Sequence, residues 1–444
     1  MIKTKLFGRN LSMGLMSLAG FATVGLTLTP PSAEAAPAFA RQTGMQCVAC
    51  HSQAFPAINA FGRAFKASGY TIMGAQPKIE GKDMSLPSTF NASVITKLRY
   101  TQSNGNTNEG ADAGQIEWPN EAALLLGGRV SENIGFMIEA GFGGPVGGET
   151  SFNLNDADTD GNLTAEVEGD SNTFLGSKIH FNVAKVGATQ LSIIPFSTDA
   201  LGVGYGLELL NTGATRAQRP IEDRTAMSAS QALGLGAGEA TGIAFAATNS
   251  KYFVNYTAWT PGFGGENMDV GTSFGSYLRA AYMPRIGSWD TGFGFQYLTG
   301  TIKQAAGKDD FGVKQFDELV TDGWVIDAQA DGQVGGKSVT VLLSTGSAKA
   351  GHINNGNPND STATALLLQY GLLPNKANAY IAHRLMDNGA ATDNKANKTT
   401  VGFMYLPSQN LRLELSHAME SGSAVDARES KLTGTTMLQL FAGF

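Results

Sequence analysis

The residues with the clearest chemical meaning in this sequence are Cys47 and Cys50, the only cysteines of the chain, and the histidine that follows them, His51. A small disulfide or a thioredoxin-like redox pair would also use two cysteines at this spacing. The adjoining histidine favours covalent haem instead. Both thiols can add to the haem vinyl groups while the imidazole is held where it must ligate the iron. The sequence therefore predicts one haem c on Cys47, Cys50 and His51.

The residues that follow must position such a group. Apolar residues recur at helical spacing from Phe55 to Phe65, so we expect an amphipathic helix with Pro56 in its first turn. Its apolar face would cover one side of a porphyrin. Arg63 and Lys66 on this helix are candidates to pair with the haem propionates, or are ordinary solvated charges.

The second axial ligand of the iron is less clearly indicated. Met73 lies in the same segment, and a thioether ligand would raise the reduction potential. His180 is an alternative if the haem segment lies inside the rest of the protein. Met73 as an ordinary packing residue, and His180 as part of a polar wall, also remain open.

The N-terminal residues have the pattern of a segment that is removed during export. Lys3 and Lys5 precede an apolar stretch from Leu11 to Leu28, and Ala33-Glu34-Ala35 then fits a cleavage site. We expect a signal peptide over 1–35, with an N-terminal membrane anchor as the alternative. Export would bring the chain to a compartment where haem c is attached.

The composition limits the partners and the domain organisation. The chain has 444 residues, 16% charged, with a net charge of −7, so it lacks the basic surface that nucleic acid requires. A monohaem cytochrome segment over 36–90 is too short to bury much core alone. The remaining residues, 91–444, are the obvious cover for it.

From Asn91 onward, short segments alternate between apolar and polar residues, as in strands with one face of each kind. We expect a first strand at about 92–102 and a last at 432–444, with fourteen more paired by seven tight turns, sixteen in all. The turns are Ser131–Asn133, Ala184–Ala188, Asn249–Lys251, Pro284–Trp289, Gly335–Gly336, Pro374–Asn375 and Pro407–Asn410. The long polar connections cover about 103–118, 145–175, 197–238, 260–271, 300–321, 345–361, 387–397 and 420–430.

Alternating short and long connections with an even strand count are typical of outer-membrane barrels. Lys97, Arg99, Arg412 and Glu414 lie opposite the apolar residues of their strands, which favours a polar lumen and an outer face in contact with lipid. The chain ends on Phe444, as such barrels often do. We therefore predict an all-β fold: a 16-stranded antiparallel outer-membrane barrel, plugged by the small α-helical cytochrome segment. A water-soluble secreted β-protein is the alternative.

The residues around the haem motif also resemble a known family. The run from Ala36 to Gly44, Phe61-Gly62-Arg63 and Gly69-Tyr70-Thr71 closely resemble the fused monohaem cytochrome–porins of iron-oxidising bacteria. The detailed match spans about 36–71, and the rest agrees in architecture only. The resemblance implies an oxidoreductase-type activity. In it, extracellular Fe(II) reduces the haem, and a periplasmic c-type cytochrome or another soluble carrier takes the electron.

Two other functions stay open. One is a diffusion porin in which the haem segment acts as a redox-sensing plug, and the other is a conduit that exports electrons to an external acceptor. A porin predicts ion conductance with the segment in place, whereas a conduit predicts little.

One predicted long connection carries a further candidate site. Asp156, Asp158 and Asp160 alternate and are followed by Gly161, which resembles the opening of a calcium loop. The twelfth position is Val167, between two glutamates, so the expected bidentate ligand is out of register. A structural Ca²⁺ site, attraction of Fe²⁺ and a solvated acidic loop all remain open.

Overall fold

The computed structural model describes residues 38–53, 55–74, 76–82, 84–106, 114–143, 175–198, 209–214, 220–222, 228–236, 240–262, 273–308, 311–352, 356–428 and 431–444. The predicted signal peptide and the Asp156–Asp160 loop lie outside the described residues.

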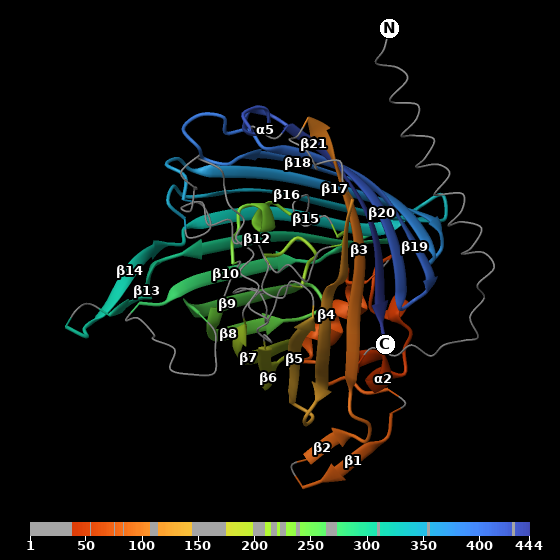
Figure 1. Ribbon diagram of the computed structural model, residues 1–444. Helices are drawn as coiled ribbons and strands as arrows, with labels where there is room; N and C mark the ends of the chain where they lie inside the picture. The colour runs from red at the N-terminus through yellow and green to blue at the C-terminus, as the bar shows by residue number, and fades with distance from the viewer. Residues whose placement is uncertain are drawn as a thin grey trace. The chain divides into compact units, whose positions relative to one another are not determined.

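Sixteen long strands of the described chain close into one antiparallel barrel (Figure 1). Neighbours in the sequence are neighbours in the sheet, and the last strand pairs with the first through Gln439 and Arg99. The strands are β3 (Ala92–Asn106), β4 (Gln115–Arg129), β5 (Ile134–Gly143), β6 (Leu175–Val186), β7 (Thr189–Thr198), β8 (Ala240–Thr248), β9 (Tyr252–Pro261), β10 (Gly275–Tyr282), β12 (Trp289–Thr299), β15 (Gly323–Val334), β16 (Lys337–Ala348), β17 (Ser361–Leu373), β18 (Ala377–Asp387), β19 (Asn397–Ser408), β20 (Leu411–Ser421) and β21 (Lys431–Gly443). A two-residue strand, β11 (Arg285–Ile286), pairs with the start of β12.

The two faces of the strands explain why the barrel suits a membrane. In β17, Leu366 and Leu368 point outward and are about 40% exposed (43% and 40%), whereas Leu367 between them is 3% exposed and faces the lumen. An apolar exterior favours lipid, and closure leaves no strand edge with unpaired backbone groups. The predicted all-β barrel is confirmed. Among the described residues, no helix is long and apolar enough to cross a membrane.

All seven predicted turns join neighbouring strands in the structure. One two-residue turn joins β15 to β16 through Gly335 and Gly336, whose φ angles of 58° and 73° suit a tight hairpin and favour glycine. The short turns therefore gather at one end of the barrel, and the longer connections gather at the other.

One connection predicted as a polar loop is a hairpin. The 300–321 stretch forms strands β13 (Thr301–Lys308) and β14 (Lys314–Val320), which pair with each other. Ile302 is buried and Leu319 packs on the same core cluster, which includes Trp259. These apolar contacts help to order a segment that the sequence predicted as a long polar connection.

The 197–238 connection is also only partly a polar surface loop. Its described parts, 209–214, 220–222 and 228–236, are largely buried. They include the short helix α4 (Ala229–Ala232), whose Leu233 and Leu235 neighbours pack against Tyr277 in the lumen. We call these three parts the inward connection. A second short helix, α5 (Ser423–Asp426), lies in the last connection.

The segment that precedes the barrel contains two α-helices, a 3-10 turn and a hairpin. They are α2 (Ala38–Thr43), η1 (Cys47–Ala49), α3 (Ala60–Ala67), β1 (Lys78–Gly81) and β2 (Met84–Pro87). The expected start of the helix at Pro56 is wrong. Asn59 caps α3, because its side chain accepts a hydrogen bond from the Gly62 N–H (3.0 Å). Gly69 (φ 68°) ends the helix in a Schellman motif.

This segment lies against barrel residues near the short turns. Hydrogen bonds join it to residues of β4, β6, β12, β15 and the β19–β20 turn. The barrel residues are Arg129, Asn182, Asp290, Asp331 and Gln409. Each lies within a few residues of a short turn. Figure 1 shows α2 and the β1–β2 hairpin at the same end as the C-terminus.

Candidate functional site

The Cys47–His51 stretch forms a single helical turn. The N–H groups of Cys50 and His51 both donate to the Cys47 carbonyl oxygen, at 3.1 and 2.9 Å. Residues at positions i, i+3 and i+4 share one face of such a turn, so both thiols and the imidazole can address one bound group. This geometry fits covalent haem.

The state of the two thiols separates haem attachment from the alternatives. Cys47 and Cys50 are half-buried and form no disulfide. Burial raises the pKa of both thiols. A thioredoxin-like pair requires a lowered thiol pKa, so this environment does not favour one.

The His51 imidazole is held in the manner expected of an iron ligand. Its Nδ1 lies 3.2 Å from the Ala57 carbonyl oxygen. A ring nitrogen that donates to a backbone carbonyl orients the ring and leaves Nε2 for a metal. Burial lowers the pKa of His51, so the neutral form that can ligate iron is favoured. The Phe55 ring packs edge-on at 5.2 Å.

Helix α3 lies tightly against the haem-attachment turn. The Asn59 N–H donates to the Cys50 carbonyl oxygen (2.9 Å), and its side-chain amide donates to the Ala49 carbonyl oxygen (3.1 Å). Gly62 rests on the same Cys50 carbonyl so closely that an added Cβ would overlap the oxygen. Glycine is required here by the close approach of two backbone segments.

Gly62→Ala should therefore push α3 away from the Cys47–His51 turn. We expect overpacking to cost about 1–3 kcal/mol of stability and to lower the fraction of chains with covalent haem. Thermal unfolding and haem per polypeptide would measure both effects. Phe61→Ala, on the exposed side of α3, is the matched control. Unchanged stability and full haem content in Gly62→Ala would contradict the packing argument.

Arg63 contacts the barrel wall, and its pairing with a haem propionate stays a prediction. It is buried, and its Nη2 lies 2.6 and 2.7 Å from the two carboxylate oxygens of Asp290 on β12. The guanidinium therefore anchors α3 to the barrel wall through Nη2, while its Nη1 is buried without a hydrogen-bond partner. Lys66, the other candidate, is half-buried at the last turn of α3.

Met73 lies beside the C-terminal end of α2, and α2 ends a few residues before Cys47 in the chain. The buried Gln42 side chain donates to the carbonyl oxygens of Tyr70 (2.5 Å) and Ile72 (2.8 Å). The Gly74 N–H donates to the Gln42 carbonyl oxygen (3.3 Å). Gln42 thus fixes the peptide that carries Met73. The ligand role of Met73 stays a prediction.

His180 faces the lumen from β6, as expected, and is buried. Its ring packs against Gly69, and its Nε2 has no hydrogen-bond partner. Gly62 lies against Cys50 of the haem-attachment turn, and Gly69 lies against His180. The seven helical residues from Gly62 to Gly69 span ~10 Å. Two ligands of one metal ion, by contrast, each lie only ~2 Å from the ion. The structure therefore places His180 at the far end of α3 from the Cys47–His51 turn.

The inward connection contacts the backbone stretch that orients His51. The Asn211 side chain accepts from the Ile58 N–H (3.1 Å) and donates to the Ile58 carbonyl oxygen (3.2 Å). Ile58 follows Ala57, whose carbonyl orients His51. The sequence reasoning missed Asn211, although Leu209 and Leu210 beside it were a sign that this connection has a buried part.

We expect Asn211→Ala to leave the Ile58 N–H and carbonyl without partners. A buried polar group that loses its partner costs about 1–3 kcal/mol. Hydrogen exchange of peptides covering residues 55–60 should become faster. Asn359→Ala, in a connection at the other end of the barrel, should leave this exchange unchanged. If residues 55–60 exchange hydrogen at the same rate in both variants, Asn211 does not hold this peptide in place.

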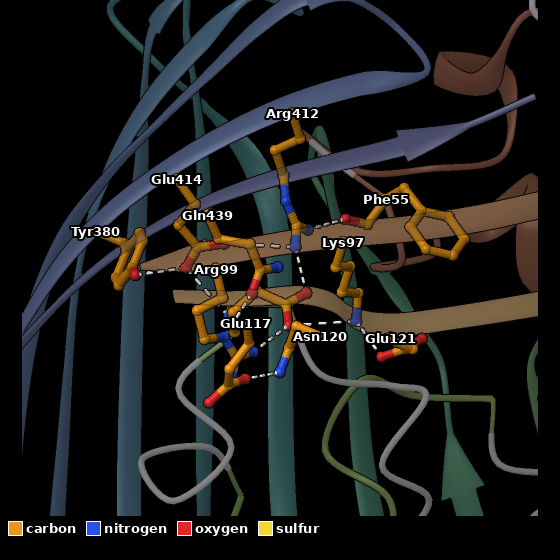
Figure 2. A network of polar contacts seen from close by, with 11 residues as sticks. Phe55, Lys97, Arg99, Glu117, Asn120, Glu121, Tyr380, Arg412, Glu414 and Gln439 are labelled. Carbon is orange, nitrogen blue, oxygen red and sulfur yellow. Dashed lines mark hydrogen bonds and ion pairs between the residues drawn. The ribbon is translucent and has the colours of Figure 1, made fainter. Parts of the chain in front are cut away.

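A network of lumen charges joins the same peptide to the barrel wall (Figure 2). Arg412 donates both to the Phe55 carbonyl oxygen and to Glu222 of the inward connection. Glu222 also pairs with Lys97 Nζ (3.4 Å) and Arg99 Nη2 (3.5 Å). Glu414 accepts from the Tyr380 hydroxyl at 2.7 Å. The predicted polar lumen is confirmed, and its charges are paired with one another.

Bare metal ions have no comparable site in the part of the chain that the structure describes. No group of three or more His, Cys, Asp or Glu side chains there converges to hold one. The residues of the Cys47–His51 turn fit a group attached through sulfur better than a free cation.

No protein-family model matches the sequence, and no curated protein matches it. Among solved structures, the fold is similar to that of OprB of Pseudomonas putida, with a TM-score of 0.52 and 12% identity over 80% of this chain and 94% of that chain. It also matches the outer membrane channel DcaP of Acinetobacter baumannii (TM-score 0.46, 10% identity, 82% and 99% coverage). A third match is an anion-selective porin from Comamonas acidovorans (TM-score 0.44, 13% identity, 80% and 98% coverage).

The chain is an outer-membrane β-barrel of porin architecture. The apolar exterior, the closed sheet and the alternation of short and long connections agree with the likeness to OprB. None of the three names describes a cytochrome. The likeness to OprB supports the porin-like fold, and the cytochrome half of the family resemblance remains a prediction.

Proposed function

We propose that this barrel binds one haem c through Cys47 and Cys50, with His51 as iron ligand, and transfers single electrons between the cell exterior and the periplasm. The observation that carries the proposal is the Cys47–His51 turn, whose imidazole is oriented through the Ala57 carbonyl. Haem, when bound, supplies reversible one-electron chemistry. The chain holds and orients the group.

The surroundings of the turn suit this role. The Phe55 ring stacks on Phe441 of β21 at 5.1 Å, which gives apolar cover next to His51. The segment lies within the barrel rather than on its periplasmic surface, which shortens the span of apolar membrane that separates it from an external donor. By the family resemblance, the donor is extracellular Fe(II) and the acceptor a soluble periplasmic carrier such as a c-type cytochrome. The activity would be that of an oxidoreductase, and the reverse flow would export electrons.

The second candidate function is a diffusion porin, with the haem segment as a redox-sensing plug. The likeness to OprB favours it, and the comparisons support this function more directly than they support iron oxidation. The inward connection would then narrow the path for solutes. The two functions differ in what crosses the barrel, electrons or ions.

Two measurements on the detergent-purified full chain separate these functions. In stopped-flow absorbance with Fe(II) near neutral pH, a conduit should show rapid growth of the reduced haem bands, lost in His51→Ala. His383→Ala, on the outer face of β18, is the matched control.

The second measurement is ion conductance in planar bilayers. A porin should show steady ion conductance, and a conduit should show little. A haem that dithionite reduces and Fe(II) does not would refute iron as donor, and high conductance would then favour the porin.

A further inference from the structure

The short-turn end of the barrel carries an unbalanced charge. Among the described residues 130–133, 184–188, 249–251, 283–288, 335–337, 374–376 and 408–410, the only acid is Glu132. Five cations lie in the same turns. We call these five residues the basic rim: Lys185, Lys251, Arg285, Lys337 and Lys376.

The charges of the basic rim are open to solvent and unneutralised. Four of its residues are exposed, and the fifth, Lys337, donates from Nζ to the Leu372 carbonyl oxygen (2.8 Å). Within the described chain, no ion pair involves any of the five. Glu132 is already paired with Arg129 (3.5 Å). The rim therefore presents net positive charge.

The basic rim lies at the end of the barrel that holds the candidate haem site. Residues 38–74 contain no aspartate or glutamate. Gln409, in one of the short turns, accepts a hydrogen bond from the Val48 N–H (3.3 Å) and donates to the Gln46 side chain (3.1 Å). Val48 lies between the two cysteines, so the Cys47–His51 turn lies at the same end of the barrel as the basic rim.

The chain as a whole has the opposite charge, with a net charge of −7. The long connections 107–113, 144–174 and 263–272 contain two, seven and two acidic residues in the sequence, and no basic ones. The short turns thus carry five cations and one acid, whereas these three long connections carry acids only. The short-turn end of an outer-membrane barrel faces the periplasm.

We propose that the basic rim docks the acidic face of a soluble periplasmic electron-carrier protein. The proposal rests on the electron-transfer function proposed above and adds the chemistry of the partner. Complementary charge steers two proteins into encounter and raises the association rate 10–10³-fold at low salt. Docking at this mouth would bring the partner to the end of the barrel where Cys47 and Cys50 lie. Electrons pass without any bond being made or broken.

The test uses the haem-loaded full chain and two soluble redox proteins as probes, plastocyanin with an acidic face and horse-heart cytochrome c with a basic one. The electron-transfer rate constant is measured against salt. With the wild type, the acidic probe should react at least about tenfold faster at low salt than at high salt. The quadruple variant Lys185→Glu, Lys251→Glu, Arg285→Glu and Lys376→Glu should lose this advantage. A matched quadruple variant at the other end, Lys303→Glu, Lys349→Glu, Lys395→Glu and Arg428→Glu, should keep it.

Three results would overturn the proposal. The basic probe could react faster than the acidic one, or charge reversal of the rim could leave the rate unchanged. Charge reversal could also abolish co-sedimentation with phosphatidylglycerol vesicles while the rate stays the same, which would make the rim a lipid anchor. Binding of plastocyanin is measured separately by fluorescence anisotropy. If the chain carries no covalent haem, the proposed function is wrong. The salt dependence of plastocyanin binding would still test whether the basic rim docks an acidic protein.

Discussion

Replacing both Cys47 and Cys50 with alanine should give a barrel that reaches the outer membrane and carries no covalent haem. These are the only cysteines in the sequence, so no thioether bond can form in the variant. The barrel itself should persist, because its backbone hydrogen bonds run between strands that begin at Ala92. Haemochrome absorbance of denatured protein measures covalent haem, and heat-modifiable electrophoretic mobility measures barrel folding.

The controls for this experiment separate attachment from folding. Cys47→Ala alone leaves one thiol for a single thioether bond. Val48→Ala changes a residue between the two cysteines and should retain the full haem content. If the wild-type chain, matured in a host that attaches haem c, carries no covalent haem, the cytochrome half of the proposal is wrong.

Asp327→Ala should cause the largest loss of stability in the lumen. Arg279 and Asp327 form a buried two-point ion pair, one arm of which measures 3.0 Å, and neither side chain is exposed. Removal of one partner leaves a buried, uncompensated charge, which costs about 3–5 kcal/mol. The Thr212 hydroxyl also donates to Asp327 at 2.6 Å, so the inward connection loses an anchor. Unfolding in guanidinium and bilayer conductance measure the two effects.

A double variant tests whether the charge is responsible. Arg279→Met with Asp327→Leu removes both charges and should recover most of the lost stability, since apolar replacements of buried pairs are often neutral. Asp360→Ala, which breaks an exposed pair with Lys349, should change little. If Asp327→Ala unfolds at the wild-type guanidinium concentration, the buried pair does not stabilise the lumen.

The sequence alone was sufficient for the barrel, and it predicts the haem chemistry of the N-terminal segment. Both rest on short-range patterns. Strand alternation has a period of two residues, and tight turns require particular residues such as Gly335 and Gly336. The haem-attachment pattern occupies five consecutive positions, so spacing in the chain equals spacing in the site.

Other features depended on distant contacts, and there the sequence was insufficient. Asn211 meets Ile58 across 153 positions, and Arg412 meets Phe55 across 357. The inward connection, the hairpin in 300–321 and the pairing of Arg63 with Asp290 arise in the same way.

The sequence by itself determined the fold class, the turn positions and a turn that can carry two thioether bonds and an iron ligand. Only the tertiary structure decided what surrounds that turn. Closure of sixteen strands brings distant polar groups together inside the barrel, where most buried polar groups form hydrogen bonds. Which partners meet depends on the register and curvature of the whole sheet, and no local pattern in the chain encodes these.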